Sequence, residues 1–132
     1  MDSLTGRGTL QKFRRTILSH EKEWNVLEPY FEKHKGMAVL AGDFNETPAS
    51  YFYQRSKVFF VDSYLEAGQG FSTTYHGTFT RNRATTFPAF RIDMVLHSPN
   101  LEAVDYKRIK SEISDHHPVV ATIKRASDGK NN

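Results

Sequence analysis

Residues 37–48 read MAVLAGDFNETP, in which a short apolar run passes abruptly into polar residues. The run Met37–Ala41 predicts a strand that is buried on both faces, as in sheets that are covered by helices. Thr47 and Pro48 are typical of a helix start, with Thr47 as the N-cap and Pro48 at the first helical position. This helix is expected to continue towards Lys57. The stretch therefore predicts strand, polar turn and helix in succession, which is typical of an α/β structure.

An amphipathic helix is expected before this strand. Apolar residues recur there at three, four or seven positions, with charged residues between them, and so form one stripe on a helix of about six turns. They are Leu10, Phe13, Ile17, Trp24, Leu27 and Phe31. The helix is expected to adjust near Pro29 and to stop at Gly36, while residues 1–9 are expected to be a flexible lead-in.

The rest of the chain alternates short apolar stretches with turns. Val58–Asp62 leads into a helical turn that ends at Gly68, and residues 68–90 predict a strand fragment and a long loop. Three further strands are predicted at Arg91–His97, Val104–Ile109 and Pro118–Lys124. Residues 126–132 are expected to be a disordered tail. The order of elements predicts a mixed α/β layer structure with one domain over residues 10–125.

Composition fits a single globular domain. The chain has 132 residues, of which 38% are hydrophobic and 25% are charged. It has no cysteine, which excludes disulfides and thiolate metal sites. No apolar run approaches the ~20 residues of a membrane helix, and no secretory signal is visible. The absence of cysteine leaves the compartment open. The net charge of +3 fits a solvated basic surface better than a nucleic-acid footprint.

Asp43 and Asn45 stand two positions apart at the end of the first predicted strand. The period of two puts both side chains on the same side, where the strand emerges into solvent. There the carboxylate can hold or deprotonate a water, and the amide can donate to a phosphoryl oxygen without adding negative charge. The alternative is that the two residues form an Asx turn and an N-cap.

Asp93 lies in the apolar strand Ile92-Asp93-Met94-Val95-Leu96, where a carboxylate is costly unless it is paired. A histidine is one natural partner, because a carboxylate that accepts from one ring nitrogen fixes the tautomer and favours the imidazolium. A salt bridge with Arg91 is the alternative. The residues alone leave these two possibilities evenly balanced.

Asp115 and His116 follow Ser114 directly before the last predicted strand. They place an acid–base histidine beside a carboxylate that could bind a metal or position water. The neighbouring His117 faces a different direction and is expected to be structural.

Three motifs in this order resemble the endonuclease/exonuclease/phosphatase superfamily, which includes deoxyribonuclease I, abasic-site endonucleases and neutral sphingomyelinases. They are Gly42-Asp43-Phe44-Asn45, Arg91-Ile92-Asp93 and Ser114-Asp115-His116-His117-Pro118. The resemblance covers the chain from about Met37 to Lys124. It implies the C-terminal half of a deoxyribonuclease I-like α/β sandwich, here as one mixed sheet with flanking helices.

The resemblance also implies a role for each matching residue. Asp43 would orient or activate the attacking water, and Asn45 would contact the scissile phosphate. Asp93 would orient His116, which would contact the phosphate and stabilise its charge or transfer a proton. Asp115 would help to position water or a Mg²⁺ (or Mn²⁺) ion. The family's main metal ligand is a glutamate of the N-terminal half, for which this chain has no room.

The implied activity is metal-dependent hydrolysis of a phosphate ester, and nucleic acid, phospholipid and sugar phosphate all remain open as substrates. Arg81 and Arg83 lie in the loop Gly77–Pro88, which is expected to be mobile and to contact the substrate. Asn45, Arg81 and Arg83 are the expected substrate-binding residues. This activity is expected of a longer parent protein, with little or none in the present chain. The alternative is a non-catalytic interaction module that retains the motifs.

A half domain would leave the inner face of its sheet open. Apolar side chains from Val39, Val95 and Val119 are expected on that face. At roughly 25 cal/mol per Å², several hundred Å² of such surface represents on the order of 10 kcal/mol of unrealised burial. The chain is therefore expected to form a homodimer, to associate with the missing N-terminal half, or to be marginally stable.

Overall fold

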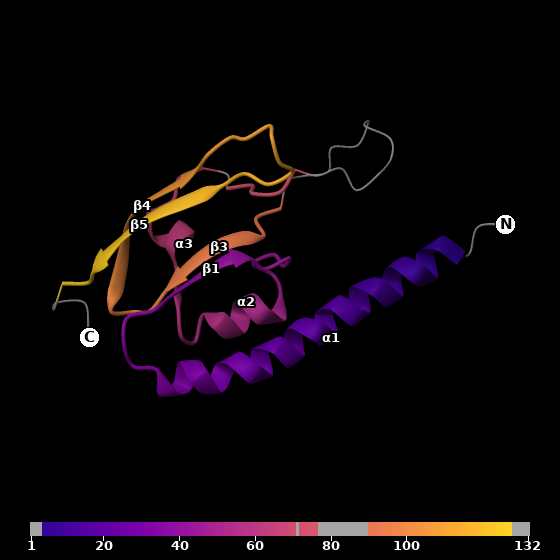
Figure 1. Ribbon diagram of the computed structural model, residues 1–132, viewed down its shortest axis with the longest axis horizontal. Coiled ribbons are helices and arrows are strands. Elements are labelled where there is room, and N and C mark those ends of the chain that lie inside the picture. The colour runs from indigo at the N-terminus through magenta and orange to yellow at the C-terminus, as the bar shows by residue number, and fades with distance from the viewer. Residues whose placement is uncertain (1–3, 71, 77–89, 128–132) are drawn as a thin grey trace. The chain divides into compact units, whose positions relative to one another are not determined.

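The computed structural model describes residues 4–70, 72–76 and 90–127, with side chains from residue 18 onward. The chain divides into two compact units, Met1–Lys35 and Gly36–Asn132. The first unit contains helix α1, and the second contains the other described helices and all the described strands (Figure 1).

Helix α1 (Leu4–Lys33) has 30 residues and includes Pro29. It confirms the predicted helix but begins at Leu4, so part of the expected lead-in is helical. The physical reason is that each residue added to an existing helix gains a backbone hydrogen bond, which can outweigh a weak local preference. Within the helix, the rings of Trp24 and Phe31 lie 5.7 Å apart. No helix in the described part of the chain is long and apolar enough to span a membrane.

Strands β1 (Val39–Asp43), β2 (Val61–Asp62) and β3 (Asp93–His97) form an antiparallel sheet with β3 in the centre. Every residue of β3 after Asp93 is buried. The register pairs Asp43 with Asp93, so the polar ends of β1 and β3 are neighbours. The sheet therefore brings together two carboxylates that are far apart in the sequence.

The expectation that the first strand is buried on both faces is wrong. β1 lies at the edge of the sheet, and most of its residues are exposed. Val39 keeps 52% of its surface accessible. An apolar sequence indicates what a strand can bury, whereas the neighbours available to it decide what it does bury.

Helix α2 (Tyr51–Ser56) begins later than predicted. Its N-cap is Ser50, whose hydroxyl oxygen accepts from the Tyr53 N–H at 3.1 Å. Thr47 and Pro48 belong instead to the preceding turn, in which the Ser50 N–H donates to the Thr47 carbonyl at 2.9 Å. Serine and threonine are both good caps, so the sequence offered two starts, and the turn selected the second.

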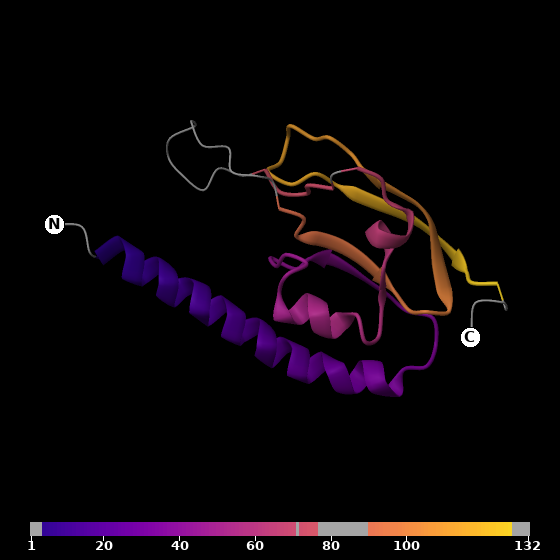
Figure 2. The same cartoon turned by 180° about the vertical axis from the view of Figure 1, so that it is seen from behind.

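Strands β4 (Leu101–Arg108) and β5 (Val119–Arg125) form a separate two-stranded antiparallel sheet. The α/β class and the three C-terminal strands are thus confirmed, but the described strands form two antiparallel sheets instead of one mixed sheet. The chain turns out of the first sheet at Ser98-Pro99-Asn100, because proline cannot donate to a continuing strand ladder. Helix α2 lies along one side of the three-stranded sheet, and β4 and β5 lie on the other (Figures 1 and 2).

A buried ionic group holds together α2, β2 and the segment just before β3. Asp62 is the N-cap of helix α3 (Ser63–Ala67), which confirms the helical turn predicted before Gly68. The Asp62 carboxylate accepts from the Tyr53 hydroxyl at 2.7 Å and lies 2.8 Å from Arg91 Nη1. Burial, with Asp62 as the next cause, raises the pKa of Tyr53 to about 12.

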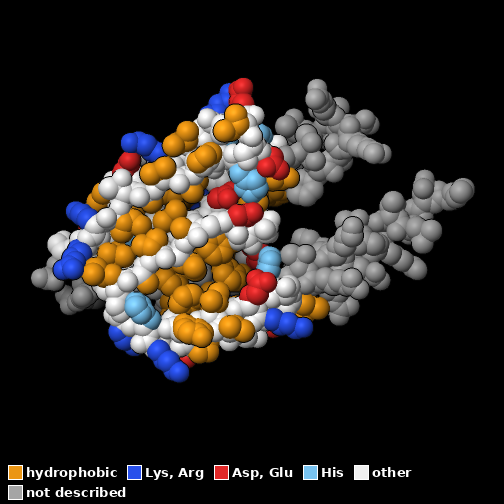
Figure 3. All heavy atoms as spheres, viewed as in Figure 1, with side chains coloured by type: hydrophobic (Ala, Val, Ile, Leu, Met, Phe, Trp, Pro, Cys, Tyr) orange, Lys and Arg blue, Asp and Glu red, His pale blue; other side chains and the backbone are white. Residues whose placement is uncertain are grey.

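Apolar side chains remain accessible on one face of the strands. Figure 3 shows hydrophobic side chains gathered over the strands, beside a group of acidic and histidine side chains. Of the residues expected on this face, Val39 is exposed and Val119 half-buried, whereas Val95 is buried. Ile113, in the segment before β5, is 99% exposed. The described part of the chain therefore leaves apolar surface for a partner to cover.

Candidate active site

Asp93 and His116 form a hydrogen-bonded pair at the end of the three-stranded sheet. His116 Nδ1 lies 2.9 Å from Asp93 Oδ2, and the side chains are 29% and 18% exposed. The structure therefore pairs Asp93 with the histidine. The alternative partner, Arg91, is engaged with Asp62 in the buried ionic group described above.

The pairing raises the pKa of the histidine. The hydrogen bond to Asp93 is the largest cause, and together with the charges of Asp93, Asp43 and Asp115 it raises the pKa of His116 against the opposing effect of burial. The imidazolium form is therefore favoured, with Nδ1–H donating to Asp93 and Nε2–H available to another acceptor.

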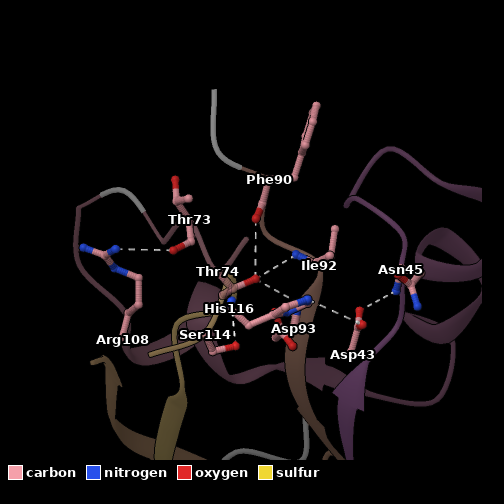
Figure 4. A network of polar contacts seen from close by, with 10 residues as sticks. All are labelled: Asp43, Asn45, Thr73, Thr74, Phe90, Ile92, Asp93, Arg108, Ser114 and His116. Carbon is pink, nitrogen blue, oxygen red and sulfur yellow. Dashed lines mark hydrogen bonds and ion pairs between the residues drawn. The ribbon is translucent and has the colours of Figure 1, made fainter. Parts of the chain in front are cut away.

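Asp43 faces the other ring nitrogen of this histidine. The distance between Asp43 Oδ2 and His116 Nε2 is 4.0 Å. Asp43 reaches this position because it ends β1 opposite the first residue of β3. Figure 4 shows the Asp43, His116 and Asp93 side chains converging at this end of the sheet.

Asn45 lies beside Asp43 in a tight turn. Its backbone N–H donates to Asp43 Oδ1 at 2.8 Å, and its φ of 50° is in the left-handed region that asparagine tolerates. The Asx turn considered from the sequence is therefore present, while the N-cap of the following helix is Ser50. The turn uses only the backbone of Asn45 in this hydrogen bond, and the asparagine side chain is exposed.

A pocket of about 450 Å³ opens at the three converging side chains. Ser114 adds a hydroxyl to its wall, and most of the rest is apolar. The apolar contributors include Ala41, Met94, Val95, Ile113, Pro118 and Val119. Asn45 and Asp115 do not line it, and Asp115 is exposed with its carbonyl accepting from the His76 N–H at 3.0 Å. Arg81 and Arg83, with the rest of the loop at 77–88, lie outside the described residues.

His117 has surroundings that differ from those of His116. Its Nδ1 accepts from the Ser111 N–H at 3.1 Å, so a neutral ring carries its proton on Nε2. Burial is the main cause that lowers the pKa of His117, followed by the charges of His76, Arg108 and Lys110. This arrangement fits the structural role expected for His117.

The segment Thr74–His76 was not identified from the sequence as part of the site. The Tyr75 ring meets the His116 ring nearly edge-on at 5.0 Å, and the His76 ring stacks on His117 at 4.3 Å. Thr74 is fully buried and hydrogen-bonds to the start of β3. The only sequence signal was the expected strand fragment in residues 68–90, which did not single out these residues.

The site offers ligand atoms for a cation. One ligand atom from each of Asp43, Asp93 and His116 lies within 4.8 Å of the others. Carboxylate oxygens suit a hard divalent ion. The Asp93 oxygen and the His116 Nδ1 are already hydrogen-bonded to each other, so Asp43 is the ligand of this group that is most available.

Solved structures similar to this chain share its fold. One is a functionally unknown conserved protein from Enterococcus faecalis V583, at 20% identity and a TM-score of 0.57, covering 84% of this chain and 44% of that chain. Another is an endonuclease/exonuclease/phosphatase from Bacteroides vulgatus, at 22% identity and a TM-score of 0.59, covering 84% and 42%. The mannosyl-6-phosphatase Bt3783 of Bacteroides thetaiotaomicron has 24% identity and a TM-score of 0.51, covering 83% and 44%. This chain thus spans less than half the length of each.

The chain was compared with curated proteins and with family profiles. The comparison with curated proteins gave no match. Residues 15–116 match the profile of the Endonuclease/Exonuclease/phosphatase family, and this region contains Asp43, Asp93 and His116. Because the match extends over more than half of the chain, the protein belongs to the Endonuclease/Exonuclease/phosphatase family.

Proposed function

We propose that this chain carries part of the active site of a metal-dependent phosphoesterase, which hydrolyses a phosphate ester with an activated water. The observation that carries the proposal is the position of His116 between two carboxylates. Its Nδ1 is 2.9 Å from Asp93 and its Nε2 is 4.0 Å from Asp43. Family membership supports the same chemistry, since phosphatases are among its members.

In this mechanism His116 acts on the phosphoryl group, and Asp93 orients His116. Asp93 holds the Nδ1–H of His116, which directs Nε2–H towards the pocket. A protonated ring there donates to a phosphoryl oxygen and stabilises the negative charge that develops in the transition state. The same proton can be passed to the leaving group by general acid catalysis.

Asp43 and Asn45 act on the water and the phosphate, respectively. The Asp43 carboxylate orients the attacking water and accepts its proton, because it ends β1 at the pocket. The Asn45 side-chain amide donates to a phosphoryl oxygen without adding negative charge. Its backbone hydrogen bond to Asp43 keeps the two residues in one turn.

The proposed metal is Mg²⁺ or Mn²⁺. Asp43, whose carboxylate belongs to the group of possible ligand atoms around His116, would hold it in this chain. Asp115, the residue before His116 in the sequence, is the second proposed ligand. When bound, such an ion polarises the phosphoryl oxygen and neutralises leaving-group charge. Two carboxylates form an incomplete set for tight binding, so the isolated chain is expected to bind the ion weakly.

The substrate is proposed to be a phosphate ester, drawn from sugar phosphates, phospholipids or nucleic acids. The mannosyl-6-phosphatase among the similar structures makes a sugar phosphate the first to test. Asn45, Arg81 and Arg83 are the candidate substrate-binding residues. The guanidinium groups would bind phosphate through charge-assisted hydrogen bonds.

The site is proposed to be completed by a partner polypeptide. Ile113, which lines the pocket, and Val39, which begins β1, are both exposed. Similar solved chains are also more than twice as long as the matched region. The partner would be the family's N-terminal half, in the same protein or as a separate chain, or a second copy of this chain. The chain alone is then expected to hydrolyse esters weakly or not at all.

The test compares hydrolysis of p-nitrophenyl phosphate and bis(p-nitrophenyl) phosphate by the 132-residue chain and by a longer protein containing it, with Mg²⁺ and with EDTA. In the longer protein, His116→Ala is expected to lower kcat on the order of 10²–10⁴-fold. His34→Ala, at an exposed position, is the matched control and should leave the rate unchanged.

Near-normal turnover by His116→Ala would reject the proposed role of this residue. Robust Mg²⁺-dependent hydrolysis by the 132-residue chain would overturn the need for a partner. A folded longer protein that hydrolyses neither ester nor a panel of sugar, lipid and nucleic-acid phosphates would instead favour the non-catalytic interaction module.

A further inference from the structure

Thr74 lies where the two segments that carry Asp93 and His116 come together. It is completely buried, at 0% exposure. Its backbone N–H donates to the Phe90 carbonyl at 3.0 Å, and its carbonyl accepts from the His117 N–H at 2.6 Å. The backbone of Thr74 therefore connects the chain just before β3 with the chain just after His116.

The Thr74 hydroxyl makes a second connection to the same strand. Its Oγ1 accepts from the N–H groups of Ile92 and Asp93, each at 3.0 Å, and lies 3.4 Å from the Phe90 carbonyl oxygen (Figure 4). A hydroxyl can donate once and accept twice, so this geometry uses its full hydrogen-bonding capacity. A side chain without the oxygen would leave buried backbone donors without an acceptor, which is costly.

The position of the hydroxyl determines how Asp93 is presented. Asp93 is the first residue of β3, and its carboxylate reaches His116 at 2.9 Å. On the side that faces β1, the Phe44 N–H donates to the Ile92 carbonyl at 2.9 Å. On the opposite side, the Thr74 hydroxyl accepts from the Ile92 and Asp93 N–H groups. The strand end is therefore held from both sides just where its carboxylate is needed.

We propose that Thr74 is a positioning residue that sets the distance between Asp93 and His116, through its hydroxyl on the Asp93 side and its backbone carbonyl on the His117 side. The inference rests on the proposed function in so far as the Asp93–His116 pair is catalytic. The placement itself is a property of the 132-residue chain and can be measured without activity.

Two substitutions separate the effect of the Thr74 hydroxyl from the effect of side-chain volume. Thr74→Val replaces the hydroxyl with a methyl group of similar size and removes the acceptor for both amides. Thr74→Ser keeps the acceptor and removes only a methyl group. Ser56→Ala is the matched control, because Ser56 is equally buried and its hydroxyl donates to the Tyr53 carbonyl in α2, away from the pocket.

The first experiment follows amide hydrogen exchange and the proton spectrum of the 132-residue chain. In Thr74→Val, the Ile92 and Asp93 amides should lose protection, and the downfield Nδ1–H resonance of His116 bonded to Asp93 should shift upfield or disappear. Thr74→Ser and Ser56→Ala should retain both signals. Unchanged signals in a folded Thr74→Val protein would overturn the proposal. If Thr74→Val does not fold, loss of either signal in Thr74→Ser would overturn the proposal.

The second experiment measures steady-state hydrolysis in a longer protein that contains the chain. Misplacement of a catalytic group by about 1 Å can cost on the order of 10²-fold in rate, so Thr74→Val should lower kcat by up to that factor with little change in KM. Thr74→Ser should recover most of the rate. An equal loss in Ser56→Ala would show that general destabilisation is the cause. An inactive wild-type protein with the expected spectra would reject the proposed function while leaving the placement by Thr74 intact.

Discussion

The imidazole of His116 is hydrogen-bonded to the carboxylate of Asp93, with 2.9 Å between Nδ1 and Oδ2, across 23 positions of sequence. The pair stands at the end of an antiparallel sheet whose register also places Asp43 opposite Asp93. One histidine thus meets a carboxylate on each side, and its ionisation should respond to changes in either one.

Asp93→Asn should lower the pKa of His116. Asparagine can still accept a hydrogen bond, but it lacks the charge that favours the imidazolium. The ring C–H resonances of His116 should titrate above the ordinary value of about 6.5 in the wild-type protein and at a lower pH in the variant. Asp105→Asn, far along β4, should leave the midpoint unchanged. Equal midpoints in wild type and Asp93→Asn would contradict the electrostatic explanation.

The raised pKa of His116 should affect both the stability and the activity of the protein. The pKa of His116 is raised on folding, so its pairing stabilises the protein fully below the unfolded value of about 6.5 and loses effect as pH rises through the folded pKa. If the imidazolium is the active form, kcat should decline over the same rise in pH. A rate that increases as pH passes the titration midpoint of His116 would argue against a protonated His116.

His117 should have the opposite dependence on pH. Its pKa is lowered by burial, so the unfolded chain takes up a proton first, and stability should fall as pH drops below about 6.5. His117→Asn keeps an acceptor near the Ser111 N–H and removes the titration. The unfolding free energy, measured in urea between neutral and mildly acidic pH, should decline less in the variant than in the wild type. Parallel curves for the two proteins would exclude this role for His117.

Asp62→Ala should destabilise the protein by about 3–5 kcal/mol, because it leaves a buried arginine without its counter-ion. The Arg91 and Asp62 side chains are 9% and 2% exposed. Asp105→Ala removes an ion pair with Lys107, in which the Asp105 and Lys107 side chains are 46% and 71% exposed. This substitution should lower the free energy of unfolding by about 0–1 kcal/mol. Urea unfolding measures both variants. Similar losses would show that the buried group contributes no more than a surface pair.

Self-association should depend on the open edge of the three-stranded sheet. β1 is an edge strand with exposed apolar residues, and charged residues on such an edge oppose pairing with another chain. Sedimentation velocity should show dimers of the 132-residue chain that Val39→Lys shifts towards monomer. Val58→Lys, at a 65% exposed position after α2, should not shift the equilibrium. A compact, stable wild-type monomer would refute the association.

The sequence alone was enough to predict the α/β class, the order of most elements and the positions of the polar motifs. These features depend on local periodicity, turn residues and chain order, which each segment carries in itself. The strand predicted at 118–124 is found at Val119–Arg125, and the helical turn before Gly68 is found at Ser63–Ala67. Choices between equivalent local signals were harder, as the shift of the α2 cap from Thr47 to Ser50 shows.

Tertiary structure decided which polar residues meet. Asp93 had two possible partners in the sequence, and the buried ionic group engages Arg91 with Asp62, while strand register and the Thr74 contacts bring His116 to Asp93. Thr74 itself could not be recognised, because its hydroxyl serves amides 18 and 19 positions away. The exposure of β1 was likewise set by its place at the sheet edge. Local sequence encodes backbone preference, whereas contacts between distant side chains arise only when strands pair in one register and their buried polar groups must all find partners.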